Sequence, residues 1–146
     1  MGPRFDPSAI PRFSVIRIPY RFGNDPPVSK LFVLLGHKSD GFGMQYAICI
    51  KTTSNEVLYG SDARRRQGCV HYAPGTLACF PLSTYVEPDN QFPISHTAIR
   101  LAHQAGQFES HPLPDDFEQR LCAAIRASIT LSQREKLRLA EYVSCL

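Results

Sequence analysis

Residues 14–35 read SVIRIPYRFGNDPPVSKLFVLL, and this stretch decides the fold. Two short apolar runs rich in β-branched residues, 15–18 and 31–35, are typical of strands. We expect Pro19 to stop the first strand. Residues 23–27 between the two runs are glycine, asparagine, aspartate and proline, which strongly favour a turn. The stretch therefore predicts a β-hairpin with a long loop that carries basic residues at its edges.

Short strands separated by turns continue along the chain. Residues 41–43 mark a turn, and residues 46–53 form a strand that becomes polar at its end. A second hairpin is expected from residues 69–72 and 77–80, and a last short strand from residues 84–87. Five or six such strands with local turns favour a closed or half-open antiparallel barrel over a parallel sheet.

Three helices are expected after the strands. Ser95 can cap the first, which ends near residue 106, and an aspartate can cap the second over residues 117–127. The third covers residues 132–143 and begins with a serine and glutamate capping box. The fold class is therefore α+β, a small antiparallel barrel followed by C-terminal helices.

The length of 146 residues suits a single domain. We expect an N-terminal arm over residues 1–12, the barrel over 13–94 and a helical part over 95–146. The apolar runs are too short to span a bilayer and no secretory signal is visible, so a cytoplasmic protein without a membrane partner is expected. Five scattered cysteines without a C-x-x-C pair predict reduced thiols, with no metal, no cofactor and no nucleophilic cysteine.

Charge is distributed unevenly along the chain. Residues 1–75 hold ten Lys or Arg against five Asp or Glu, whereas residues 76–146 hold six against eight. A basic half favours a nucleic acid or an acidic peptide as partner, because polyanions release counterions on such a surface. A solvated face without a function has the same signature.

Four stretches occur in an order that resembles the PemK/MazF family of toxin endoribonucleases. They are FSVIRIPY (13–20), KLFVLL (30–35), CIKTTS (49–54) and TYVEPDNQFPI (84–94). The resemblance implies an SH3-like barrel that forms a homodimer and cleaves single-stranded RNA without a metal. It also implies a cognate antitoxin whose tail fills the RNA groove.

The resemblance also implies site residues. The family places an arginine, usually followed by proline, at the start of the second strand, and Lys30 stands there in this chain. Either Lys30 supplies the cation, or Arg21 from the same loop does, or the activity is absent. Thr53 and Ser54 match the family's hydroxyl element after the third strand, and a register using Thr52 and Thr53 is equally allowed.

Further residues are candidates on chemical grounds. Cleavage of RNA by its own 2′-hydroxyl needs a base, a cation on the phosphorane and a donor for the leaving oxygen. His37 is a candidate acid or base, and a surface or capping histidine is the alternative. Arg21 and Lys51, together with Arg64, Arg65 and Arg66 in the loop after the third strand, are expected to contact RNA, and a solvated loop is the alternative for the three arginines.

Three functions remain in view. The first is a metal-independent endoribonuclease acting on single-stranded RNA. The second keeps the same barrel as a binding module for nucleic acid or an acidic peptide, without catalysis. The third is a structural subunit that dimerises through the edge of its barrel.

Overall fold

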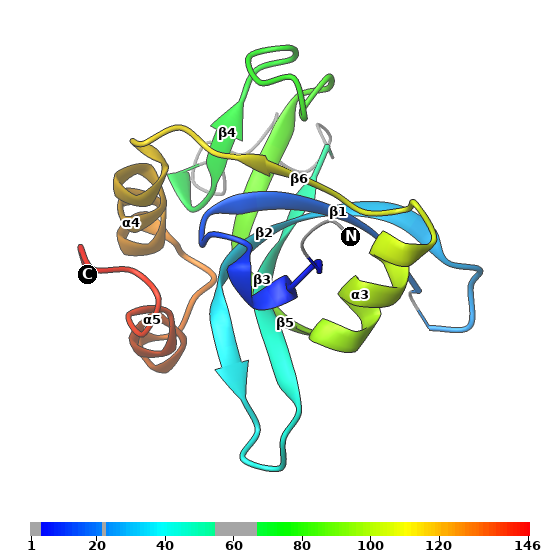
Figure 1. Ribbon diagram of the computed structural model, residues 1–146. Helices are drawn as coiled ribbons and strands as arrows, with labels where there is room; N and C mark the ends of the chain where they lie inside the picture. The colour runs from blue at the N-terminus through cyan, green and yellow to red at the C-terminus, as the bar shows by residue number, and fades with distance from the viewer. Residues whose placement is uncertain (1–3, 22, 55–66) are drawn as a thin grey trace. The chain divides into compact units, whose positions relative to one another are not determined.

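The computed structural model of the protein describes residues 4–21, 23–54 and 67–146. The described strands pair antiparallel where their registers are defined, and they follow the order β4-β5-β3-β2-β1-β6 (Figure 1). The described elements are η1 (Pro7–Ala9), β1 (Ser14–Tyr20), β2 (Val28–Ser39), β3 (Gln45–Thr53), β4 (Val70–Tyr72), β5 (Thr84–Ser95), α3 (His96–Gln104), β6 (Glu109–Pro112), α4 (Phe117–Ala127) and α5 (Gln133–Leu139). The predicted α+β class, with antiparallel strands and C-terminal helices, is confirmed.

The chain forms two compact units. Unit 1 comprises Met1–Cys49 and Phe92–Pro112, and unit 2 comprises Ile50–Gln91 and Leu113–Leu146. Strands β3 and β5 each begin in one unit and end in the other. The two units are therefore described separately below.

The hairpin of β1 and β2 organises unit 1. Ser14 pairs with Leu34 at one end and Tyr20 with Val28 at the other, so both strands are longer than the sequence predicts. The prediction that Pro19 stops β1 is wrong. Strand β6 pairs with β1 only as far as Arg17, so Pro19 pairs with β2 alone and β1 is an edge strand at this position.

Alternation along these strands builds the core of unit 1. Side chains of one face of β1, β2 and β3 pack with apolar residues of α3 and of the N-terminal arm. This cluster consists of Ile10, Ile16, Ile18, Phe32, Leu34, Ala47, Cys49, Ile94, Ile99 and Ala102. Burial of each large side chain contributes about 1.5–3 kcal/mol. The core holds α3 and the arm in place on the sheet.

In unit 2, β4 pairs with β5 rather than with residues 77–80. Val70 lies opposite Val86, and Tyr72 lies opposite Thr84. The prediction that residues 77–80 form a strand is wrong, because this segment folds as turns while β5 takes the pairing edge of β4. Strand β5 also runs far beyond the predicted residues 84–87.

The helices follow local sequence signals closely. Helix α4 covers the predicted residues 117–127 and buries one apolar side, but the predicted aspartate cap is wrong, because Asp116 at the N-cap makes no side-chain capping hydrogen bond. The predicted capping box is present at α5, where Ser132 and Glu135 each bond the other's backbone N–H, but the helix ends at Leu139. Among the described helices none is long and apolar enough to cross a membrane.

A disulfide joins Cys122 of α4 to Cys145 near the C-terminus. The prediction that all thiols are reduced is therefore wrong for this pair. The chain folds back after α5, which brings together two cysteines that are 23 residues apart. The other cysteines, Cys49, Cys69 and Cys79, are not part of a disulfide and are buried.

Candidate functional site

The two predicted hydroxyls lie where β3 ends, in unit 2. Thr52 is buried, Thr53 is half-buried and Ser54 is exposed. Successive side chains of a strand point to opposite faces, so Thr53 shares its face with Lys51 rather than with Thr52. In the register of Thr53 and Ser54, the hydroxyls are therefore more accessible than in the register that uses Thr52.

Lys51, on the same face, is held by a carboxylate. Its Nζ atom lies 3.7 Å from Oε1 of Glu87 on β5, the strand adjacent to β3. The Glu87 side chain is only 8% exposed, whereas that of Lys51 is 31% exposed. The ammonium is thus the part of the pair that reaches solvent.

Glu87 is a residue that the sequence reasoning missed. Glu87 follows Tyr85 and Val86 near the start of β5, and all three residues are buried. A single carboxylate inside such a buried stretch was the available signal, since buried carboxylates are rare unless they have a charged partner. The face of β3 and β5 therefore combines a carboxylate, an ammonium and a hydroxyl within unit 2.

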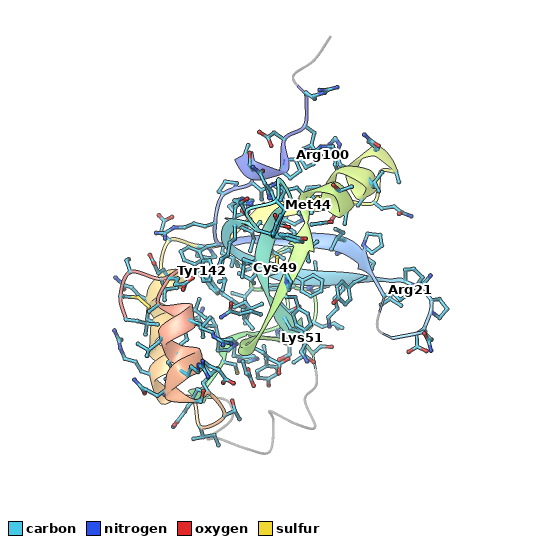
Figure 2. All side chains as sticks on the ribbon, turned by 90° about the horizontal axis from the view of Figure 1, so that it is seen from below. Arg21, Met44, Cys49, Lys51, Arg100 and Tyr142 are labelled. Carbon is cyan, nitrogen blue, oxygen red and sulfur yellow. A yellow bond between two sulfur atoms is a disulfide. The ribbon has the colours of Figure 1, made fainter. Side chains whose placement is uncertain are left out.

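The other predicted residues belong to unit 1. Lys30 lies on β2, opposite Ile18 of β1, and is half-buried. Arg21 is exposed just after β1, and Figure 2 shows its side chain at the loop that follows this strand. Arg64, Arg65 and Arg66 lie outside the described residues.

His37 uses both of its ring nitrogens inside unit 1. Its Nδ1 lies 2.8 Å from Nε2 of His96, and its Nε2 lies 3.0 Å from the carbonyl oxygen of Ile10. His96 is buried, and its pKa is lowered mainly by this burial and, to a smaller extent, by the nearby His37. These contacts favour a structural role for His37 over acid or base catalysis.

Cys49 is buried in the core of unit 1 (Figure 2). Burial raises the pKa of its thiol, because the apolar surroundings disfavour the thiolate. The thiolate is the reactive form of cysteine, so Cys49 is unsuited to nucleophilic catalysis.

The arrangement in unit 2 has the chemical groups that metal-free phosphodiester cleavage needs. A carboxylate can accept a proton, an ammonium can donate one and stabilise negative charge, and hydroxyls can hold a phosphate. Among the described residues no three His, Cys, Asp or Glu side chains gather as a metal site. Comparisons with protein-family models, curated proteins and solved structures found no match to this chain.

Proposed function

We propose that the protein is an endoribonuclease that cleaves single-stranded RNA without a metal. The observation that carries the proposal is the ion pair between Lys51 of β3 and Glu87 of β5. Thr53 lies on the same face of β3 as Lys51. The order of the four stretches that resemble PemK/MazF toxins and the basic first half of the chain also support it.

In this proposal the 2′-oxygen of a nucleotide attacks the adjacent phosphorus, and the bond to the 5′-oxygen breaks. Because the Glu87 side chain is only 8% exposed, it takes the proton of the 2′-hydroxyl through one bridging water, and the Lys51 ammonium gives a proton to the leaving 5′-oxygen. A proton transfer from Glu87 to Lys51 restores the pair, whose atoms lie 3.7 Å apart. The products are a 2′,3′-cyclic phosphate and a 5′-hydroxyl end.

Thr53 and Ser54 have a positioning task in this scheme. Hydroxyl groups at the end of a strand fix the register of a phosphate by donating hydrogen bonds to its oxygens. Ser54 is exposed and Thr53 is half-buried, so both are open to an RNA strand at the end of β3.

Lys30 enters as a separate proposal. The resemblance puts a phosphate-clamping cation at its position, but a lysine offers a point charge where arginine offers a planar fork. If Lys30 serves as such a clamp, its removal lowers the cleavage rate by about 100- to 1000-fold.

The resemblance further leads us to propose a homodimer and a cognate antitoxin. Light scattering on the purified chain tests the dimer, and a mass of one chain would argue against it. Co-expression with any small protein encoded beside it tests the antitoxin, which is expected to block RNA cleavage when bound.

A binding module without catalysis is the second candidate. The observation in its favour is Lys30, which replaces the arginine of the family pattern. In this case the basic residues of the first half of the chain hold RNA, but no bond is broken.

The deciding experiment incubates the purified protein with a long single-stranded RNA in EDTA. Glu87→Gln and Thr53→Ala are run beside it, and Glu141→Gln serves as a matched control because Glu141 is exposed in the same unit. We expect discrete fragments with 5′-hydroxyl ends, and loss of general-base catalysis in Glu87→Gln lowers the rate about 100- to 10,000-fold.

Each other outcome has a definite meaning. Intact RNA that shifts on a gel supports the binding module, and intact RNA without a shift contradicts both proposals. Equal cleavage by wild type and a folded Glu87→Gln variant removes Glu87 from the mechanism.

A further inference from the structure

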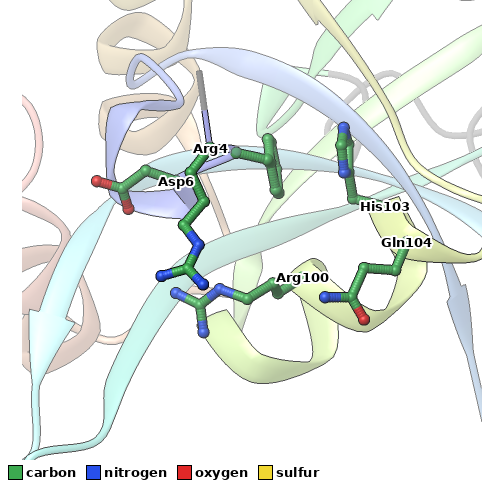
Figure 3. Close-up of a pocket in the computed structure, with 6 residues that line it drawn as sticks. Arg4, Asp6, Arg100, His103 and Gln104 are labelled. Carbon is green, nitrogen blue, oxygen red and sulfur yellow. The ribbon is translucent and has the colours of Figure 1, made fainter. Parts of the chain in front are cut away.

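The N-terminal arm and α3 line an open pocket of about 760 Å³ in unit 1 (Figure 3). Its lining includes two arginines and one carboxylate, and the guanidinium groups of Arg4 and Arg100 point into the same space. The lining residues are Arg4, Phe5, Asp6, Arg100, His103 and Gln104. None of them belongs to the site proposed above.

The arm that carries Arg4 and Phe5 is held in place on both sides of its turn. Asp6 caps η1 by accepting hydrogen bonds from the backbone N and the Oγ of Ser8, at 3.0 and 2.8 Å. Ile10 at the end of η1 is buried in the core. The pocket wall is therefore preformed, which lowers the entropy cost of binding.

Helix α3 supplies the opposite wall. Arg100, His103 and Gln104 recur at the helical spacing, so they share one exposed face. Ile99 and Ala102 on another side are buried and anchor the helix. The three polar side chains are thus presented together toward the arm.

The charge balance of the pocket favours an anion. Asp6 is the one carboxylate in the lining, and its oxygen already accepts two hydrogen bonds from Ser8. Among the described residues neither Arg4 nor Arg100 lies within 4.0 Å of a carboxylate oxygen, and both are exposed. Arg100 attracts Asp6 from a longer distance, which helps, after the hydrogen bonds from Ser8, to lower the pKa of that carboxyl. Two guanidinium forks facing one space match the oxygens of a phosphate group.

Aromatic rings lie beside these cations. The rings of Phe5 and His103 are stacked, with centroids 3.9 Å apart and planes 8° from parallel. Phe108 supports Phe5 from another side at 5.4 Å. Because His103 is exposed, the stack offers a flat surface on which a base can lie, as in many sites for single nucleotides.

We infer that this pocket binds the 5′-phosphate of a nucleotide, either a free nucleoside monophosphate or the 5′ end of an RNA strand. Arg4 and Arg100 hold the phosphate, the amide of Gln104 donates a further hydrogen bond, and the ring of His103 contacts the base. This inference goes beyond the proposed cleavage and does not depend on it, because the two sites share no residue.

Calorimetric titration of the full chain, with any purification tag at the C-terminus, tests the inference. The probes are AMP, inorganic phosphate and adenosine. AMP is expected to bind more tightly than either fragment, because only AMP uses both the guanidinium groups and the ring surface. No binding of AMP, or binding no tighter than that of phosphate, would overturn the inference.

Variants locate the binding site. Arg100→Ala is expected to weaken AMP binding about tenfold or more, since a hydrogen-bonded charge pair is lost. Arg100→Lys should restore only part of the affinity, and Arg4→Ala gives an independent loss from the other wall. Arg134→Ala, an exposed arginine of α5, removes the same charge and should leave AMP binding unchanged. Equal affinity in wild type and folded Arg100→Ala and Arg4→Ala variants would place the nucleotide elsewhere.

The source of the phosphate is decided with short RNAs. A tetranucleotide with a 5′-phosphate that binds more tightly than its 5′-hydroxyl form identifies strand ends as the ligand. Equal binding of the two, with AMP binding retained, identifies the free nucleotide. Tighter binding of tetraglutamate than of AMP would overturn the inference in favour of an acidic peptide. Glu87→Gln should keep its affinity for AMP, so failure of the cleavage proposal is distinguishable from failure of this one.

Discussion

Nδ1 of His37 lies 2.8 Å from Nε2 of His96. The other ring nitrogen of His37 is 3.0 Å from the carbonyl oxygen of Ile10, which can only accept, so neutral His37 carries its proton on Nε2. His96 is then the donor to Nδ1 of His37. Two neutral imidazoles thereby join β2, the start of α3 and the N-terminal arm.

This pair predicts that the protein loses stability in mild acid. The pKa of His96 is lowered from 6.5 by burial and by His37, so folding favours the neutral ring. The stability from this group is complete above about pH 6.5 and is lost as the pH falls through the lowered value. Urea unfolding from pH 7.5 down to pH 5 measures the effect.

The test variant is His96→Asn, which should flatten the dependence of unfolding free energy on pH because it removes the buried ring. An unchanged slope in His96→Asn would show that other groups cause the acid sensitivity.

The disulfide between Cys122 and Cys145 should stabilise unit 2. It closes a loop over a sequence separation of 23 residues, and a loop of this size contributes about 3 kcal/mol by restricting the unfolded chain. Reduction should therefore lower the melting temperature of the wild type. Cys145→Ser should melt at that lower temperature with or without reductant, and a variant that still responds to reductant would contradict the assignment.

We expect Lys51 to stabilise the fold in addition to its proposed role in RNA cleavage. Lys51→Met leaves the buried Glu87 carboxylate without its ammonium, which we expect to cost roughly 2 kcal/mol. The double variant Lys51→Met with Glu87→Gln should recover part of this loss, because the buried charge is gone. Chemical denaturation measures both, and additive losses would mean that the two side chains do not interact.

Arg120 should fasten α4 to β4. Its guanidinium donates to the carbonyl oxygen of His71 at 2.7 Å and lies 4.6 Å from the ring centroid of Tyr72. Arg120→Ala should destabilise the protein by about 1–2 kcal/mol. Arg134→Ala is the control, expected to stay within about 0.5 kcal/mol of wild type. Similar unfolding midpoints for the two variants would contradict the role of Arg120.

Local sequence signals predicted the local structure. The apolar spacing over residues 117–127 matches α4, and Ser95 and Ser132 cap the helices that they were expected to cap. These signals succeed because a helix satisfies its backbone within a few neighbouring residues. Strand β6 was missed, since its four residues ESHP carry no apolar alternation.

The candidate sites were only half visible in the sequence. Lys51, Thr53 and Ser54 could be named from their stretch, but Glu87 comes from a different strand. The pair of His37 and His96 spans 59 residues, and the pocket joins the arm near Arg4 to the helix near Arg100. No local sequence pattern predicts such contacts between residues that are far apart in the chain.

The sequence by itself determined the α+β class, the serine caps of α3 and α5, and the turns at Gly41 and Gly43, because each depends on backbone preferences of adjacent residues. Tertiary structure alone decided that Pro19 is tolerated within β1, that β4 pairs with β5, and that Cys122 joins Cys145. Those outcomes depend on which distant segment lies alongside, and that is set by burial of the shared core.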